Sequence, residues 1–165
     1  EEMTDDVEFE KKFSGALITE LRLIDEFIKS NVIKERPIRK DSFQEGYIQN
    51  YSYWALRELI MNAIMHRNYE SNAPIYIYEF SNRSEIINPG GLYGEAIPQN
   101  FPNASDYRNV VIAVAMKVLG YVNKFNYGVK RAISELVKNG HGEPKFDLSL
   151  TTKFKVAIPI NQQWQ

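Results

Sequence analysis

The 165-residue chain contains no cysteine. This absence excludes disulfide bonds, thiolate metal sites and cysteine nucleophiles. The chain also lacks a long hydrophobic run, because its longest apolar stretch, Val110 to Met116, is far too short to span a bilayer. Its 20 basic and 21 acidic residues leave a formal net charge of −1. That charge gives no general attraction to nucleic acid or to an anionic membrane.

The composition that is present is typical of a soluble globular protein. Hydrophobic residues make up 44% of the chain and charged residues 25%, and the length suits one domain with a sizeable core. Four of the first six residues are acidic, and this segment lacks signal-peptide character and does not begin with methionine. We expect a segment of a larger cytoplasmic protein with no membrane association. Its expected parts are a linker over 1–15, a domain over 16–160 and a tail over 161–165.

Hydrophobic periodicity predicts both helices and strands. The predicted helices are 16–31, 53–67 and a last one with an apolar stripe from Val129 to Val137, which Asn139-Gly140 would end. Residues 107–119 fit either a helix capped by Ser105 or Asp106, or a buried strand. The predicted strands are one or two within 36–51 that turn at Glu45-Gly46, a hairpin of 74–80 with 84–88, and a final hairpin of 145–150 with 153–160.

The helix over 53–67 carries the strongest functional signal. It is apolar around most of its circumference, which is typical of a buried helix, yet Glu58, Asn62 and His66 follow one another at i,i+4 spacing. Burying such groups is costly unless something pairs with them, so the stripe predicts one wall of a site. An amide oxygen such as that of Asn62 can bind Mg²⁺, and Glu58 could act as a base toward water. The alternative is that both face solvent at the helix edge.

His66 has a second interpretation. A histidine at the end of a helix can cap the last carbonyls and interact with the helix dipole, and we favour that structural role over catalysis. No second histidine stands at metal-ligand spacing, since His141 lies in a distant glycine-rich turn. A zinc site is therefore not expected.

Two glycine-containing segments could approach a ligand closely. Asn88-Pro89-Gly90-Gly91 opens a long loop that extends to about Asn109, and loops of that length are often binding loops or lids. The segment is equally compatible with an ordinary turn. Asn126-Tyr127-Gly128 precedes the last helix, whose N-terminus and Lys130 could bind a phosphate, although Lys130 could also be a solvated surface residue.

These residues resemble a known family over nearly the whole chain. The segments that carry the resemblance are Ala55 to Tyr69, Glu85 to Leu92, Asn100 to Asn109, Leu119 to Phe125 and Phe154 to Ile160. They are similar to the C-terminal ATPase-like domain of bacterial transcriptional regulators that are labelled helicase-related. In that family the domain usually follows a Schlafen-type, AlbA-like DNA-binding domain. The family in turn resembles the GHKL ATPases, which have the Bergerat fold.

The resemblance implies an α+β fold, a two-layer sandwich with helices on one face of a mixed, mainly antiparallel sheet. It implies ATP and Mg²⁺ as cofactors, Glu58 as catalytic base and Asn62 as metal ligand. His66, Asn88, Gly90, Gly91, Asn126, Gly128 and Lys130 are the other implied nucleotide-binding residues.

Three departures from the GHKL pattern argue against rapid hydrolysis. The aspartate of the adenine site is Asn88 here, and the first glycine before the last helix is Asn126. No lysine-rich lid is evident between Leu92 and Asn109.

Two functions therefore stay open. The first is a nucleotide-binding domain that regulates an attached DNA-binding module, so that DNA is contacted through another domain. The second is a degenerate Bergerat fold that serves dimerisation or effector docking, with aromatic residues such as Tyr47, Tyr93 and Phe101 at an interface. Direct DNA binding through the cluster Lys34, Arg36, Arg39 and Lys40 has little support from the net charge.

Overall fold

The computed structural model describes residues 10–104, 106–123 and 127–165, and the chain divides into two compact units. The first unit, Glu1–Val32, contains helix α1 (Leu17–Phe27), which continues as the π-helical turn η1 (Ile28–Val32). The ring of Phe13 packs edge-on against that of Phe27, with 5.7 Å between centroids. The helix predicted over 16–31 is thus confirmed.

The second unit, Ile33–Gln165, is built on a four-stranded sheet. Its strands are β3 (Tyr76–Glu79), β4 (Arg83–Pro89), β5 (Lys145–Asp147) and β6 (Lys153–Pro159). They lie in the order β3-β4-β6-β5, and the pairs are antiparallel. Strands β1 (Glu35–Arg39) and β2 (Glu45–Gln49) form a separate antiparallel hairpin. The two predicted hairpins of the main sheet are confirmed.

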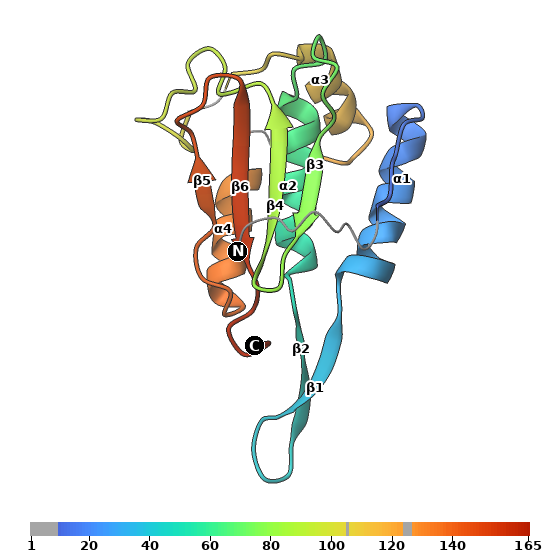
Figure 1. Cartoon of the computed structure of the whole chain (residues 1–165), viewed down its shortest axis with the longest axis vertical. Helices are drawn as coiled ribbons and strands as arrows, with labels where there is room; N and C mark the ends of the chain where they lie inside the picture. Colours follow the sequence, from blue (N-terminus) through green and yellow to red (C-terminus); the bar gives the residue numbers. More distant parts are fainter. Residues whose placement is uncertain (1–9, 105, 124–126) are drawn as a thin grey trace. The chain divides into compact units, whose positions relative to one another are not determined.

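In the part of the second unit that the structure describes, the helices are α2 (Tyr53–His66), α3 (Val110–Val118) and α4 (Gly128–Lys138). Helices α2 and α4 pack against each other behind the sheet, and α2 contacts β4 (Figure 1). The unit is therefore an α+β sandwich with helices against one face of an antiparallel sheet. This is the predicted fold class.

The core lies between the sheet and these helices. Strand β6 alternates in burial, so Phe154, Val156 and Ile158 face inward while Lys155 and Ala157 between them are more exposed. Helix α2 is buried around most of its circumference, as its composition predicts. It begins where the Ser52 hydroxyl accepts a hydrogen bond from the N–H of Ala55.

Two local predictions were wrong. The turn between β1 and β2 spans residues 40–44, where the Asp41 carboxylate accepts N–H bonds from Phe43 and Gln44, whereas Glu45 and Gly46 lie within β2. The position of this turn is set by the hydrogen bonds between the Asp41 side chain and the backbone that follows it, and not by Gly46.

The cap before α3 was also misplaced. Residues 107–119 hold a helix rather than a strand, but its N-cap is Asn109. The Asp106 carboxylate instead accepts bonds from the N–H groups of Glu95 and Tyr107 within the preceding loop, and Ser105 lies outside the described residues. Among the described residues, no helix is long and apolar enough to cross a membrane.

Candidate functional site

A pocket lies in the second unit, between α2, the long loop after β4, the start of α4 and strand β6. Four of its lining residues come from α2, and most of the others come from the loop. The lining consists of Glu58, Asn62, Met65, His66, Asn88, Gly90, Gly91, Leu92, Tyr93, Ala96, Phe101, Pro102, Ala104, Asp106, Tyr107, Val122, Gly128, Val129 and Phe154. The predicted binding loop thus forms a large part of the pocket wall.

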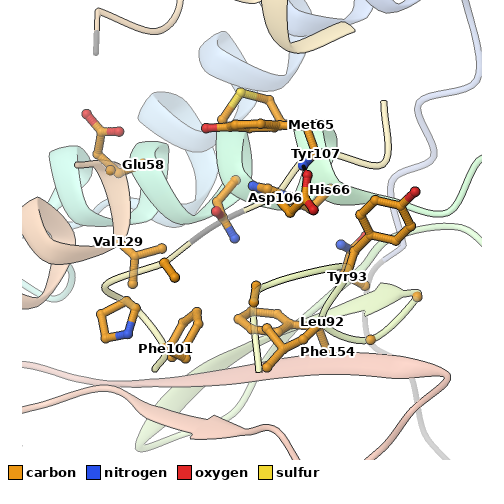
Figure 2. Close-up of a pocket in the computed structure, with 18 of the residues that line it drawn as sticks. Glu58, Met65, His66, Leu92, Tyr93, Phe101, Asp106, Tyr107, Val129 and Phe154 are labelled. Carbon is orange, nitrogen blue, oxygen red and sulfur yellow. Dashed lines mark hydrogen bonds between the residues drawn. The ribbon is translucent and has the colours of Figure 1, made fainter. Parts of the chain in front are cut away.

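One side of the pocket is apolar, and the opposite side is more polar. Figure 2 shows Phe101, Phe154 and Leu92 on one side, and Glu58, Met65 and His66 along α2 on the other. Phe101 meets Phe154 edge-on, with ring centroids 5.7 Å apart. A mostly apolar lining with a few polar groups is typical of a small-molecule site.

The structure brings most of the predicted site residues together. Glu58, Asn62, His66, Asn88, Gly90, Gly91 and Gly128 all line this pocket. Lys130 is exposed on α4 and does not contribute to the lining, and Asn126 lies outside the described residues. That any of these residues binds a nucleotide stays a prediction.

The Glu58 carboxylate is buried and paired with two arginines. Arg131 donates a hydrogen bond to Glu58 Oε1 over 3.0 Å, and Arg57 Nη1 lies 3.6 Å from the same oxygen. The two cations offset the cost of burying a charge. Sequence analysis did not predict the contact with Arg131, because the two residues are 73 positions apart in the chain and only the packing of α2 on α4 joins them.

Gly128 allows α4 to approach that carboxylate. A Cβ atom at position 128 would lie 3.0 Å from Glu58 Oε2, which is closer than ordinary van der Waals contact. Glycine at the first residue of α4 therefore keeps the end of the pocket beside Glu58 open.

Asn88 is a polar residue of the pocket lining. It lies on β4 opposite Phe154 and is 1% exposed. Among the lining residues that the structure describes, its Oδ1 atom alone is buried without a hydrogen-bond partner. An unpaired buried acceptor costs about 1–3 kcal/mol, so a hydrogen bond from a ligand or a water molecule would stabilise this residue.

His66 packs against Tyr107 instead of capping α2. The two rings are stacked with centroids 5.0 Å apart. The carbonyls of Met65 and Arg67 instead accept hydrogen bonds from the side chain of Asn109. Asn109 thus satisfies two carbonyl groups at the C-terminal end of α2. Burial, with a smaller contribution from the Arg108 cation, lowers the pKa of His66 to about 4, so His66 is neutral at pH 7.

The lowered pKa of His66 predicts that the stability of the folded chain depends on pH. The unfolded chain protonates His66 near pH 6.5 and the folded chain only near pH 4, so the unfolded state binds more protons between these values. The free energy of unfolding should fall by about 1–3 kcal/mol as the pH drops from 6.5 to 4.

His141 is also buried and its pKa is also lowered, so it too should make the folded chain less stable as the pH falls. The test is therefore urea unfolding of the wild type and His66→Phe at several pH values, because phenylalanine keeps a ring against Tyr107 but cannot titrate. The variant should lose the His66 part of the acid destabilisation. Identical pH dependence in both proteins would contradict the prediction.

The residues present fit a magnesium site of the kind that uses few protein ligands. Among the described residues, no group of three or more histidine, aspartate or glutamate side chains could hold a metal ion. Mg²⁺ commonly keeps its waters and binds through one or two protein oxygens together with substrate phosphates. Asn62 in the pocket wall can supply one such oxygen, whereas the Glu58 carboxylate is already paired with Arg131.

Comparison with known proteins gives the family. A family model described as "Putative ATP-dependent DNA helicase recG C-terminal" matches residues 72–158, slightly more than half of the chain. The chain belongs to this family. The match supports an ATPase-like domain and includes Asn88, Gly90, Gly91 and Gly128, while α2 with Glu58 and Asn62 precedes the matched region.

A solved structure has the same fold. The crystal structure of the DIP2311 protein from Corynebacterium diphtheriae matches 87% of this chain with a TM-score of 0.77 at 20% sequence identity. The match covers only 29% of that protein, so this chain corresponds to one part of a longer relative. No curated protein matches the chain.

Proposed function

We propose that this ATPase-like domain binds ATP with Mg²⁺ in the pocket and thereby regulates an attached DNA-binding module of a bacterial transcriptional regulator in the cytoplasm. The observation that carries the proposal is the convergence of Glu58, Asn62, Asn88 and Gly128 on one pocket. Three of these side chains are polar, and the family is ATPase-like. Regulation of this kind requires that the nucleotide favour one conformation of the larger protein over another.

Each end of the pocket suits a different part of the ligand. The base would lie against the apolar side formed by Phe101 and Phe154, with its polar edge toward Asn88. The phosphates would lie toward the N-terminus of α4, where N–H groups without intrahelical partners attract anions. Asn62 would contact the metal ion, which would offset the charge of the phosphates when bound.

The pairing of Glu58 argues for binding with slow hydrolysis. A general base must be free to accept a proton from water, and the Glu58 carboxylate is held by Arg131 at 3.0 Å. While that ion pair persists, Glu58 is not available as a base. Hydrolysis would require Arg131 to move away from it.

The Asn62→Ala variant tests the metal contact. Losing one oxygen ligand should weaken ATP binding in Mg²⁺ on the order of tenfold, to near the level of the wild type without Mg²⁺. Asn72→Ala is the matched control, since Asn72 is exposed and outside the pocket. Calorimetric titration of both variants, with folding checked by circular dichroism, gives the answer. Unchanged Mg²⁺-dependent binding in folded Asn62→Ala would show that the proposed site is wrong.

A second candidate is a degenerate fold that mediates homo-oligomerisation or effector docking. The observation in its favour is the exposed apolar surface of α3. Its exposed apolar side chains are Val110, Val111, Val114 and Val118, and Leu119 directly follows them. Contiguous exposed apolar residues are typical of interaction surfaces. Sedimentation that depends on protein concentration, without any effect of nucleotide, would favour this candidate.

One cation of the basic cluster, Arg36, makes contacts within the protein. Arg36 donates a hydrogen bond to the carbonyl of Gln163 and stacks over the ring of Trp164 at 5.0 Å. This cation therefore holds the C-terminal segment.

A further inference from the structure

We propose that Asn88 makes the pocket a site for purine nucleotides of both the 6-amino and the 6-oxo class, so that ATP and ITP bind with similar affinity. This inference rests on the proposed function, because it concerns the base that the nucleotide pocket accepts. It starts from Asn88, a lining residue of that pocket whose Oδ1 is buried without a hydrogen-bond partner.

The surroundings of Asn88 leave few other groups to recognise the edge of a base. The N–H groups of Gly90 and Gly91 already donate to the carbonyls of Thr152 and Thr151, at 2.8 and 3.2 Å. Both backbone donors are therefore used in joining the loop to the segment before β6.

The pocket carboxylates are also engaged. Asp106 accepts the N–H groups of Glu95 and Tyr107, and Glu58 is paired with Arg131. The ring of His66 is stacked on Tyr107. Among the described lining residues, Asn88 is the one with a buried oxygen that has no hydrogen-bond partner, and we assign recognition of the base edge to it.

An amide can serve either class of purine. Its oxygen accepts a hydrogen bond and its NH₂ group donates one. A 6-aminopurine presents a donor at N6 beside an acceptor at N1, and a 6-oxopurine presents an acceptor at O6 beside a donor at N1. Rotating the Asn88 amide by half a turn about its last torsion exchanges donor and acceptor, and in its present orientation Oδ1 has no protein hydrogen-bond partner.

A carboxylate at this position would not have this freedom. An ionised aspartate only accepts hydrogen bonds, so the carboxylate oxygen that faces position 6 of the purine would accept a bond from a 6-amino group but would repel a 6-oxo oxygen. Discrimination that depends on a mispaired buried polar group is large. Asn88→Asp should therefore convert a permissive site into one that selects adenine.

The experiment is a calorimetric titration of the 165-residue chain with a non-hydrolysable ATP analogue and the corresponding ITP analogue, at pH 8 so that an introduced aspartate is ionised. For the wild type we expect dissociation constants within about threefold of each other. For Asn88→Asp we expect the ratio of the ITP constant to the ATP constant to rise about tenfold or more. Asn88→Ala should weaken the binding of both analogues.

The outcomes separate this inference from the proposed function. Binding of ATP with ITP more than tenfold weaker in the wild type would overturn the inference and leave the proposed function standing. So would undiminished binding of both analogues to Asn88→Ala, or an unchanged ratio in Asn88→Asp. If neither analogue binds the folded wild type, the proposed function itself fails. The wild-type comparison decides the matter even if a variant does not fold.

Discussion

Gly91→Ala should lower the free energy of unfolding by about 2–3 kcal/mol. A Cβ atom at position 91 would lie 2.6 Å from the carbonyl oxygen of Thr151 and 2.9 Å from that of Leu150. Both neighbours are backbone atoms, so no side chain can rotate away. The N–H of Gly91 also donates to Thr151, which holds the two segments at this distance. To relieve this steric clash, the loop after β4 would have to move away from the segment before β6.

Gly46→Ala provides the control for this effect. A Cβ atom at position 46 would also come too close to a neighbour, but that neighbour is the end of the exposed, flexible Lys40 side chain. We expect this variant to lie within about 0.5 kcal/mol of the wild type. Urea unfolding of both variants measures the difference. Equal stability of Gly91→Ala and Gly46→Ala would refute the role assigned to Gly91.

Gly128→Val should abolish most nucleotide binding and leave the domain folded. The first side-chain atom would already lie 3.0 Å from Glu58 Oε2, and valine adds two methyl groups beyond it. The carboxylate cannot retreat freely, because Arg131 and Arg57 hold it. The valine therefore occupies the phosphate end of the pocket. We expect ATP affinity to fall by about tenfold or more, since each 1.4 kcal/mol of lost binding free energy is a factor of ten.

Ser134→Val is the matched control, since it places the same side chain at an exposed position of the same helix. Its ATP affinity should equal that of the wild type, and the thermal midpoints of the two variants should show that both are folded. If Gly128→Val binds ATP as tightly as Ser134→Val does, the phosphates do not lie beside the start of α4.

The elements of the fold were largely predictable because each has a strong local signal. The alternation along β6 and the i,i+4 stripe of α2 depend only on the period of the local structure. The turn before β2 was misplaced, since its geometry depends on the Asp41 side chain and not on the glycine. The cap of α3 was misplaced because Asp106 is engaged with the backbone of its own loop.

The candidate site was predictable only where its residues share one element or one motif. Glu58, Asn62 and His66 were grouped through helical spacing, and Asn88 to Gly91 through the glycine motif. The apolar wall of Phe101 and Phe154 was not predicted, because these residues lie on a loop and a strand that are distant in sequence. The arginine that neutralises Glu58 was missed for the same reason, since sequence spacing contains no information about how α2 packs on α4.

Composition alone predicts that aromatic residues such as Tyr47, Tyr93 and Phe101 lie at an interface. The structure places Tyr93 and Phe101 in the pocket lining, whereas another aromatic residue, Tyr51, is 1% exposed in the core. Of these aromatic residues, Tyr47 remains largely exposed on β2. Aromatic composition by itself thus did not distinguish core, pocket and surface.

The measurement that most directly tests nucleotide binding is isothermal titration of the wild-type chain with a non-hydrolysable ATP analogue, with and without Mg²⁺. We expect saturable binding that Mg²⁺ strengthens, because the pocket combines an amide oxygen for the metal with an open helix N-terminus for the phosphates. A folded sample that gives no binding heat up to millimolar ligand would contradict nucleotide binding at this site.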